Sequence, residues 1–82
     1  MVKIIFLNLL RSKYGINQIM VLPGSVESAM KQILNQYPQI IPKDIEESVM
    51  FINQAKVMHY NRFEVLLNDG DEVVLTHFVG GG

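Results

Sequence analysis

The chain of 82 residues contains no cysteine, so no disulfide framework can form, and a cytoplasmic location is the default expectation. Positive and negative charges nearly cancel, with a formal net charge of −1. This balance gives no basis for binding nucleic acid or an anionic membrane, each of which needs a basic stripe. The longest apolar runs are far too short to span a bilayer, and no secretory leader is visible.

Glycine is scarce except at one place. Three of the six glycines occupy the last three positions of the chain, where glycine adds little to the stability of a fold. With 49% apolar residues and balanced charge, the rest of the chain predicts one small globular domain. We therefore expect a folded domain over residues 1–79 and a flexible tail over residues 80–82.

The first part of the chain predicts a strand hairpin. Residues 2–10 are β-branched and apolar and favour a first strand. A polar connection over residues 11–15 ends in a turn glycine. Residues 16–22 alternate weakly and favour a second strand, antiparallel to the first, which Pro23-Gly24 ends.

The clearest helix follows directly. Ser25 is placed as an N-cap, and Pro38 ends the helix because the residue before proline is disfavoured in α geometry. Apolar residues recur at helical spacing and form one stripe. They are Val26, Ala29, Met30, Ile33, Leu34 and Tyr37.

The second half of the chain predicts strands again. A loop over residues 38–47 with a short helical turn near residues 44–47 leads to strands at 49–52 and 55–58, joined by a tight turn. The Asp69-Gly70 pair marks a turn before a last strand over residues 72–78. This order predicts an α+β β-grasp fold, with a mixed sheet of four to five strands packed on one main helix.

Residues 69–75 (DGDEVVL), a short spacer and the terminal glycines form the most distinctive motif of the chain. The motif is accompanied by Leu10-Arg11 with Gly15, by residues 23–26 (PGSV) and by residues 51–53 (FIN). Nearly the whole chain thus resembles the MoaD/ThiS family of ubiquitin-like sulfur carriers. The long stretch 38–47 resembles the MoaD branch, which includes the small subunit of molybdopterin synthase. Two departures are residues 76–78 (THF), where family members commonly carry prolines, and the extra Gly80.

The resemblance implies that Gly82 is the reactive residue and Gly81 its slender approach. A terminal carboxylate is ionised at neutral pH, so it is a poor electrophile until it is activated. In the family, an E1-like adenylyltransferase uses ATP to adenylate this group, and sulfur then displaces AMP to leave a thiocarboxylate. The sulfur would be donated within the molybdopterin synthase large subunit or an equivalent acceptor enzyme, and the carrier would bind no cofactor itself.

Both partners need a docking surface as well as a tail. In the last strand, Val73 and Leu75 are expected to face the helix, which leaves the alternate positions on the outer face of the sheet. Apolar residues there would form a partner surface, unless the 38–47 loop covers them. Arg11 would pair with a partner carboxylate or with the tail, or would be a solvated loop residue. The predicted partner-binding residues are Gly80, Val79, Phe78, Thr76, Val74, Ile5, Leu7 and Arg11.

We expect no metal site and no catalytic site belonging to the chain itself. His59 and His77 are isolated and lack metal-ligand spacing, and the serines have no histidine base at a recognisable distance along the sequence. No glycine-rich phosphate loop is present. We therefore predict a carrier that is not an enzyme, is monomeric when free, and has neither nucleic acid nor membrane as a partner.

Three other functions fit the same residues. The chain would be a ubiquitin-like modifier if Gly82 were joined to lysines of target proteins. It would be a sulfur carrier for thiamine or for tRNA thiolation if the acceptor pathway were different. It would be a β-grasp interaction module if its terminus were never used.

Overall fold

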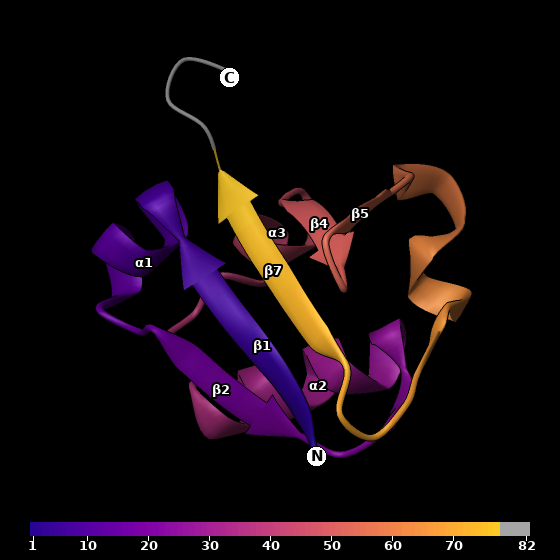
Figure 1. Cartoon of the computed structure of the whole chain (residues 1–82). Coiled ribbons are helices and arrows are strands. Elements are labelled where there is room, and N and C mark those ends of the chain that lie inside the picture. Colours follow the sequence, from indigo (N-terminus) through magenta and orange to yellow (C-terminus); the bar gives the residue numbers. More distant parts are fainter. Residues whose placement is uncertain (78–82) are drawn as a thin grey trace.

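A five-stranded mixed sheet forms the centre of the fold in the computed structural model, which describes residues 1–77 apart from the side chains of residues 59 and 60. The strand order is β2-β1-β7-β4-β5, with β1 and β7 parallel and the other neighbours antiparallel. The first and last strands therefore lie side by side in the middle of the sheet, as expected for a β-grasp fold (Figure 1). The strands are β1 (Val2–Leu7), β2 (Gln18–Val21), β4 (Val49–Ile52), β5 (Ala55–Val57) and β7 (Glu72–His77).

The main helix α2 (Val26–Gln36) packs on one face of this sheet, behind it in Figure 1. Ser25 Oγ accepts a hydrogen bond from the Ser28 amide at 3.1 Å, which confirms the predicted N-cap. The apolar stripe is also confirmed, because Val26, Ala29, Met30 and Ile33 are buried against the core. Val73 and Leu75 of β7 are buried in the same core, as expected.

The expectation of a first strand reaching residue 10 was wrong, as was that of a polar connection over 11–15. The strand β1 ends at Leu7, and helix α1 (Asn8–Tyr14) follows. Asn8 adopts a left-handed φ of 54°, which turns the chain out of the strand. One turn later, Leu10 is buried in the core, and burial of an apolar helical face outweighs the weak strand preference of an Asn-Leu-Leu run.

The stretch between α2 and β4 contains the expected helical turn, α3 (Pro42–Glu46). Pro42 begins it, which suits proline because the first amide of a helix has no intrahelical acceptor. Ile40 and Ile45 are buried in the core, and α3 lies behind the sheet on the side of α2 (Figure 1). The 38–47 stretch therefore extends the helical layer and leaves the outer face of the sheet uncovered.

Two further elements had no prediction. A 3₁₀ segment, η1 (His59–Glu64), follows β5, and a small antiparallel pair joins β3 (Gly24–Ser25) to β6 (Leu66–Leu67). The pair joins residues 43 positions apart (Gly24 opposite Leu67), so no local sequence pattern marks it.

A buried guanidinium holds η1 in place. Arg62 is fully buried and donates hydrogen bonds to the backbone carbonyls of Ile45 (3.1 Å), Glu46 and Ser48. These carbonyls lie at the end of α3, where a cation is favoured by the helix dipole. The arginine thus ties the 59–64 segment to the start of β4.

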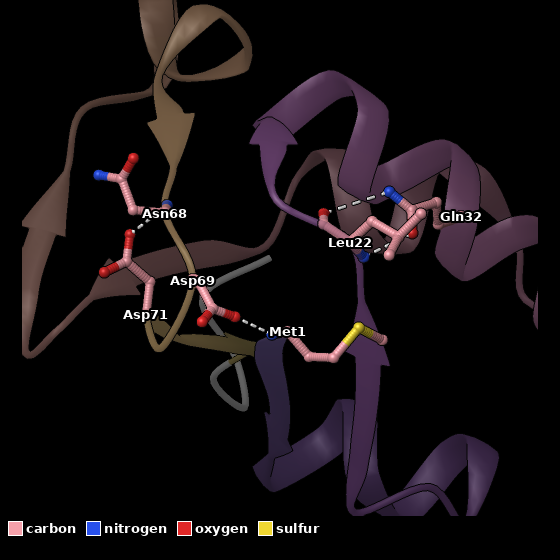
Figure 2. Close-up of polar contacts among 6 residues, drawn as sticks. All are labelled: Met1, Leu22, Gln32, Asn68, Asp69 and Asp71. Carbon is pink, nitrogen blue, oxygen red and sulfur yellow. Dashed lines mark hydrogen bonds and ion pairs between the residues drawn. The ribbon is translucent and has the colours of Figure 1, made fainter.

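The turn before β7 is organised by Asp71, whose carboxylate accepts hydrogen bonds from the Asn68 amide at 2.8 Å and from Asn53 Nδ2 at 3.0 Å. These hydrogen bonds, that of Asn68 first, lower the pKa of Asp71. In the same turn, Asp69 forms an ion pair with the amino group of Met1 (Figure 2). The start of β7 is thereby fixed beside the start of β1.

Side chains of α2 cover the outer edge of β2. The Gln32 amide accepts from the Leu22 N–H at 2.7 Å and donates to the Leu22 carbonyl at 3.4 Å (Figure 2). One turn on, Gln36 Nε2 donates to the Met20 carbonyl at 3.0 Å. These hydrogen bonds occupy backbone groups at one end of the edge strand, which makes that end a poorer template for pairing with another chain.

Candidate functional site

The predicted reactive end of the chain follows β7 directly. Residues 78–82, with Phe78, Val79, Gly80, Gly81 and Gly82, lie outside the described residues, so their assigned roles stay predictions. The geometry that can be described is that of the strand leading to them. This strand is central in the sheet and ends at His77, beside α1 (Figure 1).

An apolar row crosses the outer face of the sheet. Ile5 and Phe51 both lie opposite Val74 in register, one on each side of β7. All three side chains are half-buried, and exposed Gln18 and Lys56 extend the row at its two ends. We call Ile5, Val74 and Phe51 the outer-face row. It is the apolar, accessible surface that the sequence predicted at Ile5 and Val74.

Phe51 was not among the predicted site residues. Alternation along the 49–52 strand would have placed its side chain on one face or the other, but which face depends on the pairing with β7. The register between two strands that are 20 residues apart is a tertiary property.

One expected surface residue is buried. Thr76 points to the outer face by register with Leu7, yet it is only 2% exposed. Asn8 Nδ2 donates a hydrogen bond to Thr76 Oγ1 at 2.7 Å, and α1 packs over this end of the strand. Thr76 therefore offers little surface to a partner in this structure, because the strand-to-helix switch at Asn8 covers it, and its assignment as a partner contact stays a prediction. Leu7, its neighbour, remains half-buried.

Arg11 lies on α1, in place of the loop that was expected for it. Its side chain is exposed, and α1 lies beside the end of β7 (Figure 1). The position is compatible with a contact to a partner near the tail. That role stays a prediction.

A polar cluster lies on the other side of the same strand end. Asp44 Oδ2 accepts hydrogen bonds from Lys13 Nζ (2.7 Å) and from the Tyr14 hydroxyl (2.5 Å). The Asp44 backbone carbonyl accepts one from the His77 ring at Nε2. Lys13, Asp44 and His77, together with Leu9 and Leu10, line a hollow of about 150 Å³.

The contacts shift the ionisation of three groups in this cluster. The hydrogen bond from Lys13, followed by that from Tyr14, lowers the pKa of Asp44. Burial, followed by the hydrogen bond to Asp44, raises the pKa of Tyr14. The hydrogen bond to Asp44 raises the pKa of Lys13. The cluster is thus a charged structural tie between α1 and α3, with its charges in the ionised state and Tyr14 protonated at neutral pH.

Neither Asp44 nor Tyr14 was among the predicted site residues. No sequence signal links Lys13 or Tyr14 to a carboxylate that lies 31 or 30 positions away along the chain. In the part of the chain that the structure describes, no three His, Cys, Asp or Glu side chains gather in a group that could hold a metal ion. Among the same residues, no helix has the length and apolar character needed to cross a membrane.

The fold and the position of β7 define a ubiquitin-like β-grasp domain, with its C-terminal strand at the centre of the sheet. The ThiS family model matches residues 4–82. The chain therefore belongs to the ThiS family and is a ubiquitin-like sulfur carrier.

Solved structures agree on the fold. The chain is similar to the small archaeal modifier protein 1 (SAMP1) of Methanosarcina acetivorans, with 22% identity and a TM-score of 0.79 over 99% of this chain and 95% of that chain. It is similar to a chain of the Amycolatopsis orientalis BexX/CysO complex, with 18% identity and a TM-score of 0.79 over 100% of each chain.

A third similar structure is a chain in the complex of subunits 1 and 2 of the molybdopterin-converting factor from Helicobacter pylori. It has 17% identity and a TM-score of 0.67 over 99% of this chain and 97% of that chain. A search of the curated proteins found no match to this chain. Two of these similar structures are complexes with a second protein.

Proposed function

We propose that the chain carries sulfur as a thiocarboxylate on Gly82 and donates it in the synthesis of molybdopterin, as the small subunit of molybdopterin synthase. The observation that carries the proposal is the family match, which runs through residue 82 and so includes the terminal glycines. The similarity to a molybdopterin-converting factor complex supports the particular pathway.

The chemistry requires an activated carboxyl group. An oxygen of the Gly82 carboxylate attacks the α-phosphorus of ATP, and pyrophosphate leaves. A sulfur nucleophile then displaces AMP from the acyl adenylate and leaves a terminal thiocarboxylate. Both steps belong to an E1-like partner, and the carrier contributes a slender terminus and a surface by which it is held.

Reach and docking fit together in this proposal. The four residues 79–82 extend at most about 13–14 Å. A partner that binds the outer-face row would have to place its active site within this reach of residue 79. The chain itself needs no nucleophile, no base and no bound cofactor.

Intact mass spectrometry tests the proposal. The chain is incubated with ATP, the E1-like adenylyltransferase and a sulfide source, and we expect a mass gain equal to replacing one oxygen atom by sulfur. A variant with one alanine added after Gly82 is the control, since it keeps the fold and removes the reactive carboxyl from its place. An unchanged mass for the unmodified chain would contradict the carrier function, and loading of the extended variant would show that the terminus is not the reactive group.

The pathway is tested separately by a pull-down. Recovery of a molybdopterin synthase large subunit with the tagged chain would support molybdopterin synthesis, and recovery of a thiamine-pathway or tRNA-thiolating enzyme in its place would overturn it. The similarity to SAMP1, a modifier protein, favours a second candidate function, in which Gly82 is joined to lysines of other proteins. Peptides that carry Gly82 in isopeptide linkage would identify that activity.

A further inference from the structure

The last two described residues of β7 are held by side-chain contacts on opposite faces of the sheet. On the outer face, Asn8 Nδ2 donates to Thr76 Oγ1 at 2.7 Å. On the inner face, the His77 ring donates from Nε2 to the Asp44 carbonyl, which can only accept. Successive strand residues point to opposite faces, so the two hydrogen bonds hold neighbouring residues, one on each face of the sheet. We call Asn8, Thr76, His77 and Asp44 the root clamp.

The two residues of the clamp that lie outside β7, Asn8 and Asp44, are themselves held in place. Asn8 has a left-handed φ of 54°, a conformation that asparagine tolerates better than most residues, and it forms a parallel bridge to His77. Asp44 is held by Lys13 and Tyr14 of α1, and the Tyr14 hydroxyl also accepts from the Ile41 amide at 3.0 Å. Helix α1 thus contacts Thr76 through Asn8 and contacts α3 through Lys13 and Tyr14. In turn, α3 contacts His77 through the Asp44 carbonyl.

We propose that the root clamp is a positioning device that orders the end of β7 and so sets the direction in which the chain continues beyond His77. The inference rests on the proposed function. The direction of the chain beyond His77 affects affinity only if one partner binds the outer-face row and the terminus at the same time. Ordering one backbone residue on binding reduces affinity by about tenfold. Because residues 76 and 77 are already ordered in the free protein, binding does not carry this loss of affinity at these two residues.

The burial of Thr76 distinguishes a positioning role from ordinary core packing. Thr76 is a polar residue that is 2% exposed at the point where the strand ends, and its hydroxyl has a dedicated partner. A valine would fill the same space without the hydrogen bond. The clamp therefore uses directional contacts at a place where apolar packing alone would have supplied stability.

Matched asparagine variants test the clamp. Asn8→Gly keeps the left-handed backbone and deletes the amide that holds the end of β7. Asn53→Gly is the control, because Asn53 has a φ of 49° and its side chain accepts from the Glu72 amide at 2.9 Å, at the start of the same strand. His77→Leu removes the inner contact, and His77→Gln keeps a donor at nearly the same place.

Two measurements are made on each variant. Nitrogen-15 relaxation of the amides of residues 76–79 reports motion at the root, and we expect it to increase in Asn8→Gly and His77→Leu and to stay unchanged in Asn53→Gly. Steady-state adenylation by the E1-like enzyme should show KM for the carrier raised about tenfold, with kcat within twofold. His77→Gln should restore both readouts. Thr76→Val serves in place of Asn8→Gly if the latter does not fold.

The outcomes separate the clamp from the proposed function. Failure of the unmodified chain to be adenylated overturns the proposed function, and the relaxation data then decide the clamp. Unchanged relaxation in Asn8→Gly and His77→Leu overturns the clamp, as does unchanged KM in a chain that is loaded normally. An equal effect in Asn53→Gly also overturns it, because the cause would then be general loosening of the strand.

Discussion

Ile5 and Val74 lie opposite one another in the parallel β1–β7 pair, and both remain half-buried at the centre of the sheet's outer face. Helices α2 and α3 lie on the opposite face of the sheet, so this apolar pair keeps part of its surface accessible (Figure 1). A charge placed there would interfere with binding to another protein more than with folding. The first prediction follows from this relationship.

Val74→Glu should fold with a loss of unfolding free energy of about 1 kcal/mol, typical of substitutions at partly exposed positions. Its affinity for the E1-like adenylyltransferase should fall at least about tenfold, because a carboxylate would be desolvated in an apolar contact. Calorimetric titration measures the affinity. Lys56→Glu, at the exposed end of the same row, should have a smaller effect, and equal affinities for Val74→Glu and the unmodified chain would contradict the docking role.

Arg62 is expected to be the most costly single position outside the apolar core. Arg62→Ala leaves a cavity and three backbone carbonyls without their donor, so the free energy of unfolding should fall by about 2–4 kcal/mol. Arg62→Met fills more of the space and should lose less, since only the hydrogen bonds are missing. Urea denaturation measures both values. A loss below about 0.5 kcal/mol for Arg62→Ala would show that the buried guanidinium has little net effect on stability.

The Lys13–Tyr14–Asp44 cluster predicts a stability that depends on pH at both extremes. The pKa of Asp44 is lowered from 3.8, so its contribution is present above that pH and is lost as the pH falls through the folded-state value. The pKa values of Tyr14 and Lys13 are raised from 10.0 and 10.5, so their contributions are present below those values and are lost at higher pH.

Asp44→Asn keeps the backbone carbonyl that receives His77 and removes the carboxylate. The difference in unfolding free energy between the unmodified chain and this variant should be constant from about pH 5 to 9 and should shrink below about pH 4. Thermal unfolding at a series of pH values measures it. Glu27→Gln, in an exposed pair with Lys31, is the control and should show little difference from the unmodified chain.

Gly15 ends α1 with a φ of 66°, and an added Cβ would meet no atom within 4 Å. Gly15→Ala should therefore cost about 1 kcal/mol through the backbone alone. Gly15→Asn should cost less, since asparagine tolerates this conformation. For a domain of this size, 1 kcal/mol corresponds to a shift of about 4–8 °C in Tm. Equal Tm values for Gly15→Ala and the unmodified chain would mean that the turn adopts another conformation without penalty.

Much of the fold was predictable because its signals are local. The α2 stripe, its Ser25 cap, the short strands near residues 50 and 56 and the Asp-Gly turn all depend on neighbours within a few positions. The start of α1 was not predictable in this way. Leu9 and Leu10 follow the apolar run of β1 after a single asparagine, and the helix forms because Leu10 is buried in a core made by residues from distant parts of the chain.

The sequence by itself determined the β-grasp class, the family resemblance and the terminal glycines on which the proposed chemistry depends. Only the tertiary structure decided which residues surround the root of those glycines. Asn8 and Thr76 are 68 positions apart, and Asp44 and His77 are 33 apart. Their contacts exist because β1 and β7 pair at the centre of the sheet and bring α1 and α3 to the same end. Local preferences specify each element, but the register between distant strands specifies which side chains meet.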